Sequence, residues 1–101
     1  MDLIGKKVII RADCAGVFFG TLVSKNDTPA GVECEIKECR RIWYWNGAAS
    51  LSQLETEGVK DKANSKLTVI EPQMLVMQVI EIIPCTEKAI ENIESVPVWK
   101  R

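Results

Sequence analysis

Residues 17–23 read Val17-Phe18-Phe19-Gly20-Thr21-Leu22-Val23 and predict a β-strand that bends near its middle. Valine and phenylalanine favour a strand, and the run is apolar on both faces apart from Gly20 and Thr21. A glycine inside a strand often marks a bend, a bulge or the close approach of another backbone. Small barrels need such bends, so this stretch favours a small barrel or a strongly bent sheet.

Further strands are predicted on either side of this bend. Residues 6–11 are short and β-branched, and Val32-Glu33-Cys34-Glu35-Ile36-Lys37 alternates between apolar and polar residues. The alternation then loses its phase, because Ile42 continues the inward row but so do Glu38 and Arg40. We expect a turn or bulge at residues 37–39, followed by a separate strand or a bent continuation over residues 40–45.

The second half of the chain adds two strands and two helices to this prediction. Residues 67–70 and 74–83 are expected to be strands, interrupted by Glu71-Pro72. Ser50-Leu51-Ser52-Gln53 fits a capping box and predicts a short helix that stops at Gly58. A second helix is predicted from about Thr86 to residue 94. The fold class is therefore mainly β (α+β): a small barrel or strongly bent antiparallel sheet with a short inserted helix and a C-terminal helix.

Length and composition limit the classes of protein that fit. The chain has 101 residues and is expected to form a single domain over residues 1–101. Its net charge of −1 argues against a general nucleic-acid binder. There is no histidine, and the four cysteines, Cys14, Cys34, Cys39 and Cys85, form no Cys-x-x-Cys pair. We therefore expect no metal site and no cofactor, and read the cysteines as small apolar residues in a reducing cytoplasm.

Neither a signal peptide nor a membrane-spanning run is expected from the sequence. Instead, the chain is more apolar than one small sheet readily buries. Residues 74–83 are apolar on both faces, and the tail carries Val96, Val98 and Trp99. We expect the tail to pack on the body or on a second subunit, and we expect a homo-oligomer with the C-terminal segment at the contact.

A candidate binding site lies where the predicted strand leads into the first helix. Residues 40–53 hold two of the three tryptophans, the only tyrosine and the only adjacent arginine pair, and then a run of small residues. Aromatic rings stack on bases, guanidinium groups pair with phosphates, and backbone N–H groups at a helix start suit an anion. The candidate ligand-binding residues are Arg40, Arg41, Trp43, Tyr44, Trp45, Asn46, Gly47, Ala48, Ala49 and Ser50.

Simpler interpretations of the same residues stay open. The aromatic residues can pack a core or an interface, the arginines can be solvated, and the small residues can be an ordinary helix entry. Neighbouring arginines in a strand point to opposite faces, so at most one of Arg40 and Arg41 joins a single site. A Cys39 thiol of lowered pKa beside these arginines is the one candidate nucleophile, but it has no histidine partner, and we expect no enzyme.

Two resemblances add to this interpretation. Leu3-Ile4-Gly5-Lys6-Lys7-Val8 and Gly20-Thr21-Leu22 resemble the small barrels of the SH3-like and Sm-like type. The Asp and Asn that mark the RNA site of Sm proteins have no clear counterparts here, so RNA binding through the barrel is the third of three functional hypotheses.

Nearly the whole chain is similar to a family of small tailed-bacteriophage proteins. The residues that carry the similarity are Leu3-Ile4-Gly5-Lys6-Lys7-Val8-Ile9-Ile10-Arg11, Gly16-Val17-Phe18-Phe19-Gly20-Thr21-Leu22, residues 41–54, Glu81-Ile82-Ile83-Pro84-Cys85-Thr86 and Val96-Pro97-Val98-Trp99. This resemblance implies a phage protein that acts in the cytoplasm of the host bacterial cell.

Small phage proteins include nucleotide sponges, which form oligomers and sequester the cyclic signals of bacterial immunity. By analogy with that class, the first hypothesis is an anti-defence protein that binds a small nucleotide ligand, of the cyclic oligonucleotide or cyclic ADP-ribose type, without cleaving it. The second is a protein-interaction module that inhibits a host enzyme or defence protein.

Overall fold

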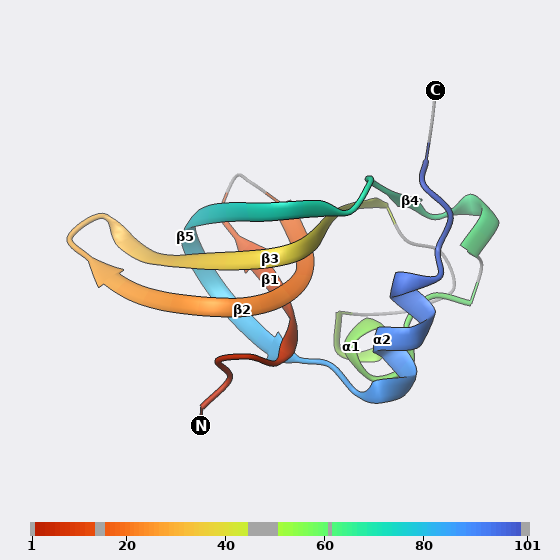
Figure 1. Ribbon diagram of the computed structural model, residues 1–101, viewed down its shortest axis with the longest axis horizontal. Coiled ribbons are helices and arrows are strands. Elements are labelled where there is room, and N and C mark those ends of the chain that lie inside the picture. The colour runs from red at the N-terminus through yellow and green to blue at the C-terminus, as the bar shows by residue number, and fades with distance from the viewer. Residues whose placement is uncertain (1, 14–15, 45–50, 61, 100–101) are drawn as a thin grey trace.

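The chain folds into one antiparallel sheet with two short helices at one end (Figure 1). The computed structural model describes residues 2–13, 16–44, 51–60 and 62–99. In chain order the elements are β1 (Lys7–Ala12), β2 (Gly16–Thr28), β3 (Gly31–Tyr44), α1 (Leu51–Glu57), the 3-10 turn η1 (Lys62–Asn64), β4 (Lys66–Leu67), β5 (Glu71–Pro84) and α2 (Glu87–Glu94). The mainly β class expected from the sequence is confirmed.

The strands of the sheet pair in a ring. β1 pairs with β2 and β5, β3 also pairs with β2 and β5, and the two-residue β4 adds to β3. For the pairings to return on themselves, the long strands must bend strongly, as β2, β3 and β5 do in Figure 1. The expectation of a strongly bent antiparallel sheet is therefore confirmed.

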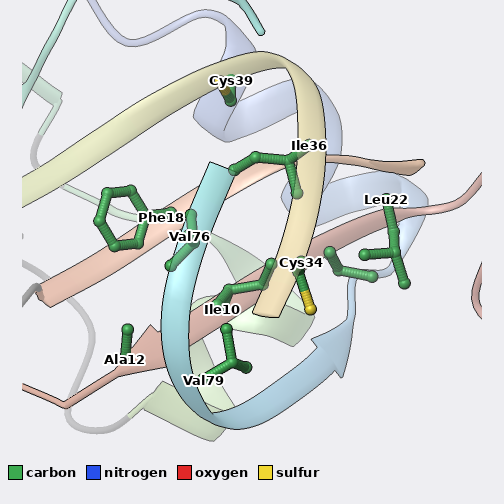
Figure 2. Packing of buried hydrophobic residues seen from close by; sticks show 10 residues of the cluster. Ile10, Ala12, Phe18, Leu22, Cys34, Ile36, Cys39, Val76 and Val79 are labelled. Carbon is green, nitrogen blue, oxygen red and sulfur yellow. The ribbon is translucent and has the colours of Figure 1, made fainter. Parts of the chain in front are cut away.

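Each side of the bent sheet buries its own group of apolar residues. The concave side encloses residues of all four long strands, among them Ile10, Phe18, Ile36 and Val76 (Figure 2). On the other side, Ile9 and Phe19 of neighbouring strands pack with Leu54, Ala89 and Ile93 of the helices. The run at residues 17–23, which is apolar on both faces, follows from this, because this part of β2 is covered on both faces.

Two local irregularities make the bending possible. Glu38 has a positive φ of 49°, and the β2–β3 register shifts between Phe19 and Thr21, opposite this residue. The bulge resets the phase of β3, so that Cys39 returns to the concave core after Cys34 and Ile36. This confirms the bulge expected at residues 37–39. Gly20 lies against the bulge, and a Cβ there would come within 2.8 Å of the Cys39 Cβ.

We predict that Gly20→Ala destabilises the protein, because the added methyl group meets Cys39 in a core that has no room for it. Overpacking of this kind costs about 1–3 kcal/mol. Chemical denaturation followed by tryptophan fluorescence measures the free energy of unfolding. An unchanged free energy would show that β2 and β3 do not need their close approach at this position.

The predicted ends of the helices are largely confirmed. The Thr86 hydroxyl accepts a hydrogen bond from the Ala89 amide at 3.2 Å and begins α2, as expected. Gly58 follows α1 with a φ of 78°, a conformation that favours glycine. The Asn92 side chain joins the helical segments by bonds to the backbone N–H and C=O of Val59, each at 2.7 Å. The helix start expected at Ser50 lies outside the described residues.

The segment between the helices corrects one prediction. The strand expected over residues 67–70 is limited to β4, and β5 begins at Glu71 and includes Pro72, where the sequence predicted a break. Proline is tolerated at an edge of a sheet, where its missing N–H costs no ladder bond.

The C-terminal tail packs on the body of its own chain, which was one of the two expected positions. Val96 is buried, Leu67 bridges to Val98, and the Trp99 amide donates to the Leu67 carbonyl at 2.9 Å. No helix in the described part of the chain is long and apolar enough to cross a membrane.

Candidate functional site

Arg40 was predicted to bind a ligand, and the structure corrects this. Its side chain is 2% exposed and points toward the helices. Nε donates to the Thr68 carbonyl at 2.8 Å, and Nη1 donates to the carbonyls of Ile93 and Val96 at 2.9 and 2.7 Å. Nη2 is buried without a hydrogen-bond partner in the described structure, and burial lowers the pKa of Arg40. The residue holds the end of α2 and the tail on β3, and it is closed to a ligand.

We predict that Arg40→Met lowers the free energy of unfolding by about 3 kcal/mol or more, because three carbonyls lose a charged donor and remain buried. Arg41→Met is the matched control: it removes the same group from an exposed position and should change stability by about 0.5 kcal/mol or less. Urea denaturation of both variants tests the contrast. Equal effects of the two substitutions would contradict the structural role of Arg40.

Arg41 takes the opposite face of β3, as expected for neighbouring arginines in a strand. Its guanidinium carbon lies 5.1 Å from the centre of the Phe18 ring, its cross-strand neighbour in the β2–β3 pairing. The side chain is exposed, and within the described residues no carboxylate forms an ion pair with it. Arg41 is therefore a cation held beside an aromatic ring and open to an anionic partner.

A pocket of about 490 Å³ opens next to Arg41. Phe18 and Val76 contribute apolar surface from the concave core, and consecutive β5 residues from Met74 to Gln78 form one wall. Polar groups come from Arg41, Asp13, Glu33 and Gln78, so the described residues of the pocket offer one cation and two carboxylates around an apolar surface. Its volume is within the range of about 300–1,000 Å³ typical of sites for small ligands.

Trp43 was predicted to lie in the core, in an interface or in a ligand site, and it is not in the core. Its side chain is 63% exposed, whereas the preceding residue, Ile42, is buried. Ile42 pairs with Leu67 of β4, and Tyr44 pairs with the adjacent Lys66. β3 therefore has one extra residue, Trp43, between the two pairs, which is a bulge. Trp43 does not line the pocket, but it lies two residues from Arg41.

We predict that Trp43→Ala changes the free energy of unfolding by about 0.5 kcal/mol or less, because the ring is exposed. Phe18→Ala, by contrast, empties a buried position and should cost about 3–5 kcal/mol. Thermal denaturation followed by circular dichroism compares the two variants. A large loss of stability for Trp43→Ala would show that the ring is buried in solution, by this chain or by a partner.

The other predicted site residues are only partly placed. The backbone of Tyr44 ends β3. Trp45, Asn46, Gly47, Ala48, Ala49 and Ser50 lie outside the described residues, so the proposed anion site at the helix start remains a prediction.

The residues that the sequence analysis missed are Phe18, Asp13 and the β5 wall. They are far from residue 41 along the chain, and only the β2–β3 register could have linked Phe18 to Arg41.

The cysteine chemistry considered for Cys39 is also corrected. The thiol is buried in the concave core, and burial, together with the nearby Glu71, raises its pKa above the ordinary value. A raised pKa disfavours the thiolate, so Cys39 is not an activated nucleophile. Burial and the nearby Glu55 raise the pKa of Cys85 to about 12. Among the described residues, no three His, Cys, Asp or Glu side chains are grouped in a way that could hold a metal ion.

Comparison with known proteins identifies the family. Residues 5–93 match the family model described as "Domain of unknown function (DUF6948)". The chain belongs to this family. The DUF6948 match begins just before β1 and ends within α2, so it contains every strand and all the pocket residues named above. None of the curated proteins and none of the solved structures matches the chain.

Proposed function

We propose that this DUF6948 protein binds and sequesters a small nucleotide signal of bacterial immunity, of the cyclic oligonucleotide or cyclic ADP-ribose type, without cleaving it. The observation that supports this proposal best is the position of Arg41: an exposed guanidinium beside Phe18, at a pocket with apolar surface. A nucleotide has the matching parts, because its phosphate pairs with a guanidinium and its base has flat apolar faces.

The remaining polar groups suit the rest of such a ligand. Asp13 and Glu33 are acceptors for the amino group of a base or for ribose hydroxyls, and the Gln78 amide both donates and accepts. Among the described residues of the pocket, one cation next to two carboxylates favours a ligand with few phosphates over a polyanion such as RNA. For this reason RNA binding remains the least supported of the three functions.

The expected affinity is sufficient for sequestration. Stacking contributes roughly 1–3 kcal/mol per base, and a hydrogen bond to a charged group contributes about 1.5–3 kcal/mol. Two or three such interactions support micromolar binding or better, after the entropy cost of association. Trp45 to Ser50, which the sequence predicts to bind the same ligand, lie outside the described residues.

The biological setting belongs to the same proposal. The resemblance to tailed-bacteriophage proteins supports an anti-defence role in the cytoplasm of the host. The ring of strand pairings supports assignment of the sheet to the SH3-like or Sm-like small barrels.

We predict that Arg41→Ala weakens nucleotide binding about tenfold or more, equivalent to ~1.4 kcal/mol, because a phosphate loses its charged partner. Titration calorimetry against cyclic dinucleotides, cyclic trinucleotides and cyclic ADP-ribose isomers measures this, after the ligand has been found from the rise in melting temperature. Arg11→Ala is the control, since Arg11 is exposed, pairs with Glu81 at 3.1 Å and does not line the pocket. If none of these nucleotides raises the melting temperature of the wild-type protein, the proposal is wrong.

The second candidate function is a protein-interaction module that inhibits a host enzyme or defence protein. It is favoured by exposed apolar side chains at one end of the sheet: Trp43 on β3, and Val69 and Ile70 in the connection from β4 to β5. The two segments are joined, because the Thr68 amide donates to the Arg41 carbonyl at 3.0 Å. A failed nucleotide screen, together with loss of a captured host protein on Trp43→Ala, would select this function.

A further inference from the structure

The first half of β5 has a free edge. Residues 71–76 pair with β3 on one side, from Cys39 opposite Glu71 to Cys34 opposite Val76. The pairing of β5 with β1 begins only at Val79, and the Asp13 amide donates to the Gln78 carbonyl at 2.9 Å. For residues 72–77 the described structure contains no strand on the side away from β3. Backbone N–H and C=O groups there are open to another strand.

Beyond Pro72, this edge lacks the charged side chains that usually protect such strands. Residues 73–77 read Gln73-Met74-Leu75-Val76-Met77 and contain no charge, and Leu75 and Met77 are 56% and 62% exposed. The free edge of β2 beyond Leu22 provides a comparison within the same molecule. It carries Lys25 and Asp27, and charged side chains discourage pairing with another chain.

The chemistry of the edge identifies its partner. A strand added here meets apolar side chains on both faces, since Val76 points to the concave core while Leu75 and Met77 point outward. Residues 73–77 of a second copy have the same property. Antiparallel pairing of identical strands about a two-fold axis at Leu75 sets Gln73 opposite Met77 of the second copy and brings no two charges together.

We propose that two copies of this chain pair through the free edges of β5 and form a continuous sheet across a two-fold axis. The same contact bears on the pocket, because residues 74–78 of the paired strand line it. The second copy would border the pocket, so each pocket is completed by the partner strand. The dimer itself does not depend on the proposed nucleotide ligand, whereas the role of the partner in the site does.

Light scattering on protein free of absorbing nucleotide tests the contact. The wild-type protein is expected at twice the 11.3 kDa chain mass, or at a multiple of that dimer. Leu75→Lys should give the monomer, because the two lysines would lie directly opposite each other at the axis. Ile70→Lys is the matched control, since Ile70 is 55% exposed but lies outside the edge, and it should keep the wild-type mass.

Two further measurements keep the test decisive. Met77→Lys, at a second exposed position of the edge, should also dissociate the dimer if Leu75→Lys fails to fold. Amide hydrogen exchange within residues 73–77 should slow as the protein concentration rises.

A monomeric wild-type protein at micromolar concentration overturns the proposal, and so does a mass that both edge variants leave unchanged. If the wild-type protein binds a nucleotide as a monomer, only the proposed dimer is wrong. If it is a dimer that binds no nucleotide, only the proposed function is wrong.

Discussion

The buried guanidinium of Arg40 joins β3 of the sheet to the C-terminal helix and tail. It donates three hydrogen bonds of 2.7–2.9 Å to backbone carbonyls, one in the segment after β4, one at the end of α2 and one in the tail. A cation is costly to bury, and those hydrogen bonds offset much of the cost. The helices also pack against apolar residues of β1 and β2, but that contact is non-directional. Arg40 adds the fixed geometry that places the end of the chain beside β3.

The bulge at Glu38 determines which arginine is used for this purpose. Because the bulge resets the alternation of β3, Arg40 faces the helices and Arg41 faces Phe18. Two residues of the same type, adjacent in the chain, thereby acquire different roles. One is structural and closed to solvent, and the other is exposed at a pocket.

The same strand geometry links the pocket to the free edge of β5. β5 has a positive φ of 54° at Gln78, and at the next residue, Val79, its pairing with β3 ends and its pairing with β1 begins. Before this point, residues 72–77 have no strand of the described structure on the side away from β3, and residues 74–78 line the pocket. A ligand site and an assembly surface at this position would therefore share a wall, and binding at one would influence the other.

The sequence by itself determined the strands of the first half of the chain, the glycine bend, the bulge region and the Thr86 cap, because these depend on local alternation and local hydrogen bonds. It did not determine the ends of β4 and β5 around Pro72. It also determined that Arg40 and Arg41 could not share a site. It did not determine which of the two faces solvent, since that depends on where β3 bulges and on the packing of α2, which is 46 residues or more away along the chain. Likewise, the pocket joins residues of β2, β3 and β5, and only the tertiary pairing of those strands brings Phe18, Arg41 and Met74 together. Local patterns set the elements, and register and long-range packing set the site.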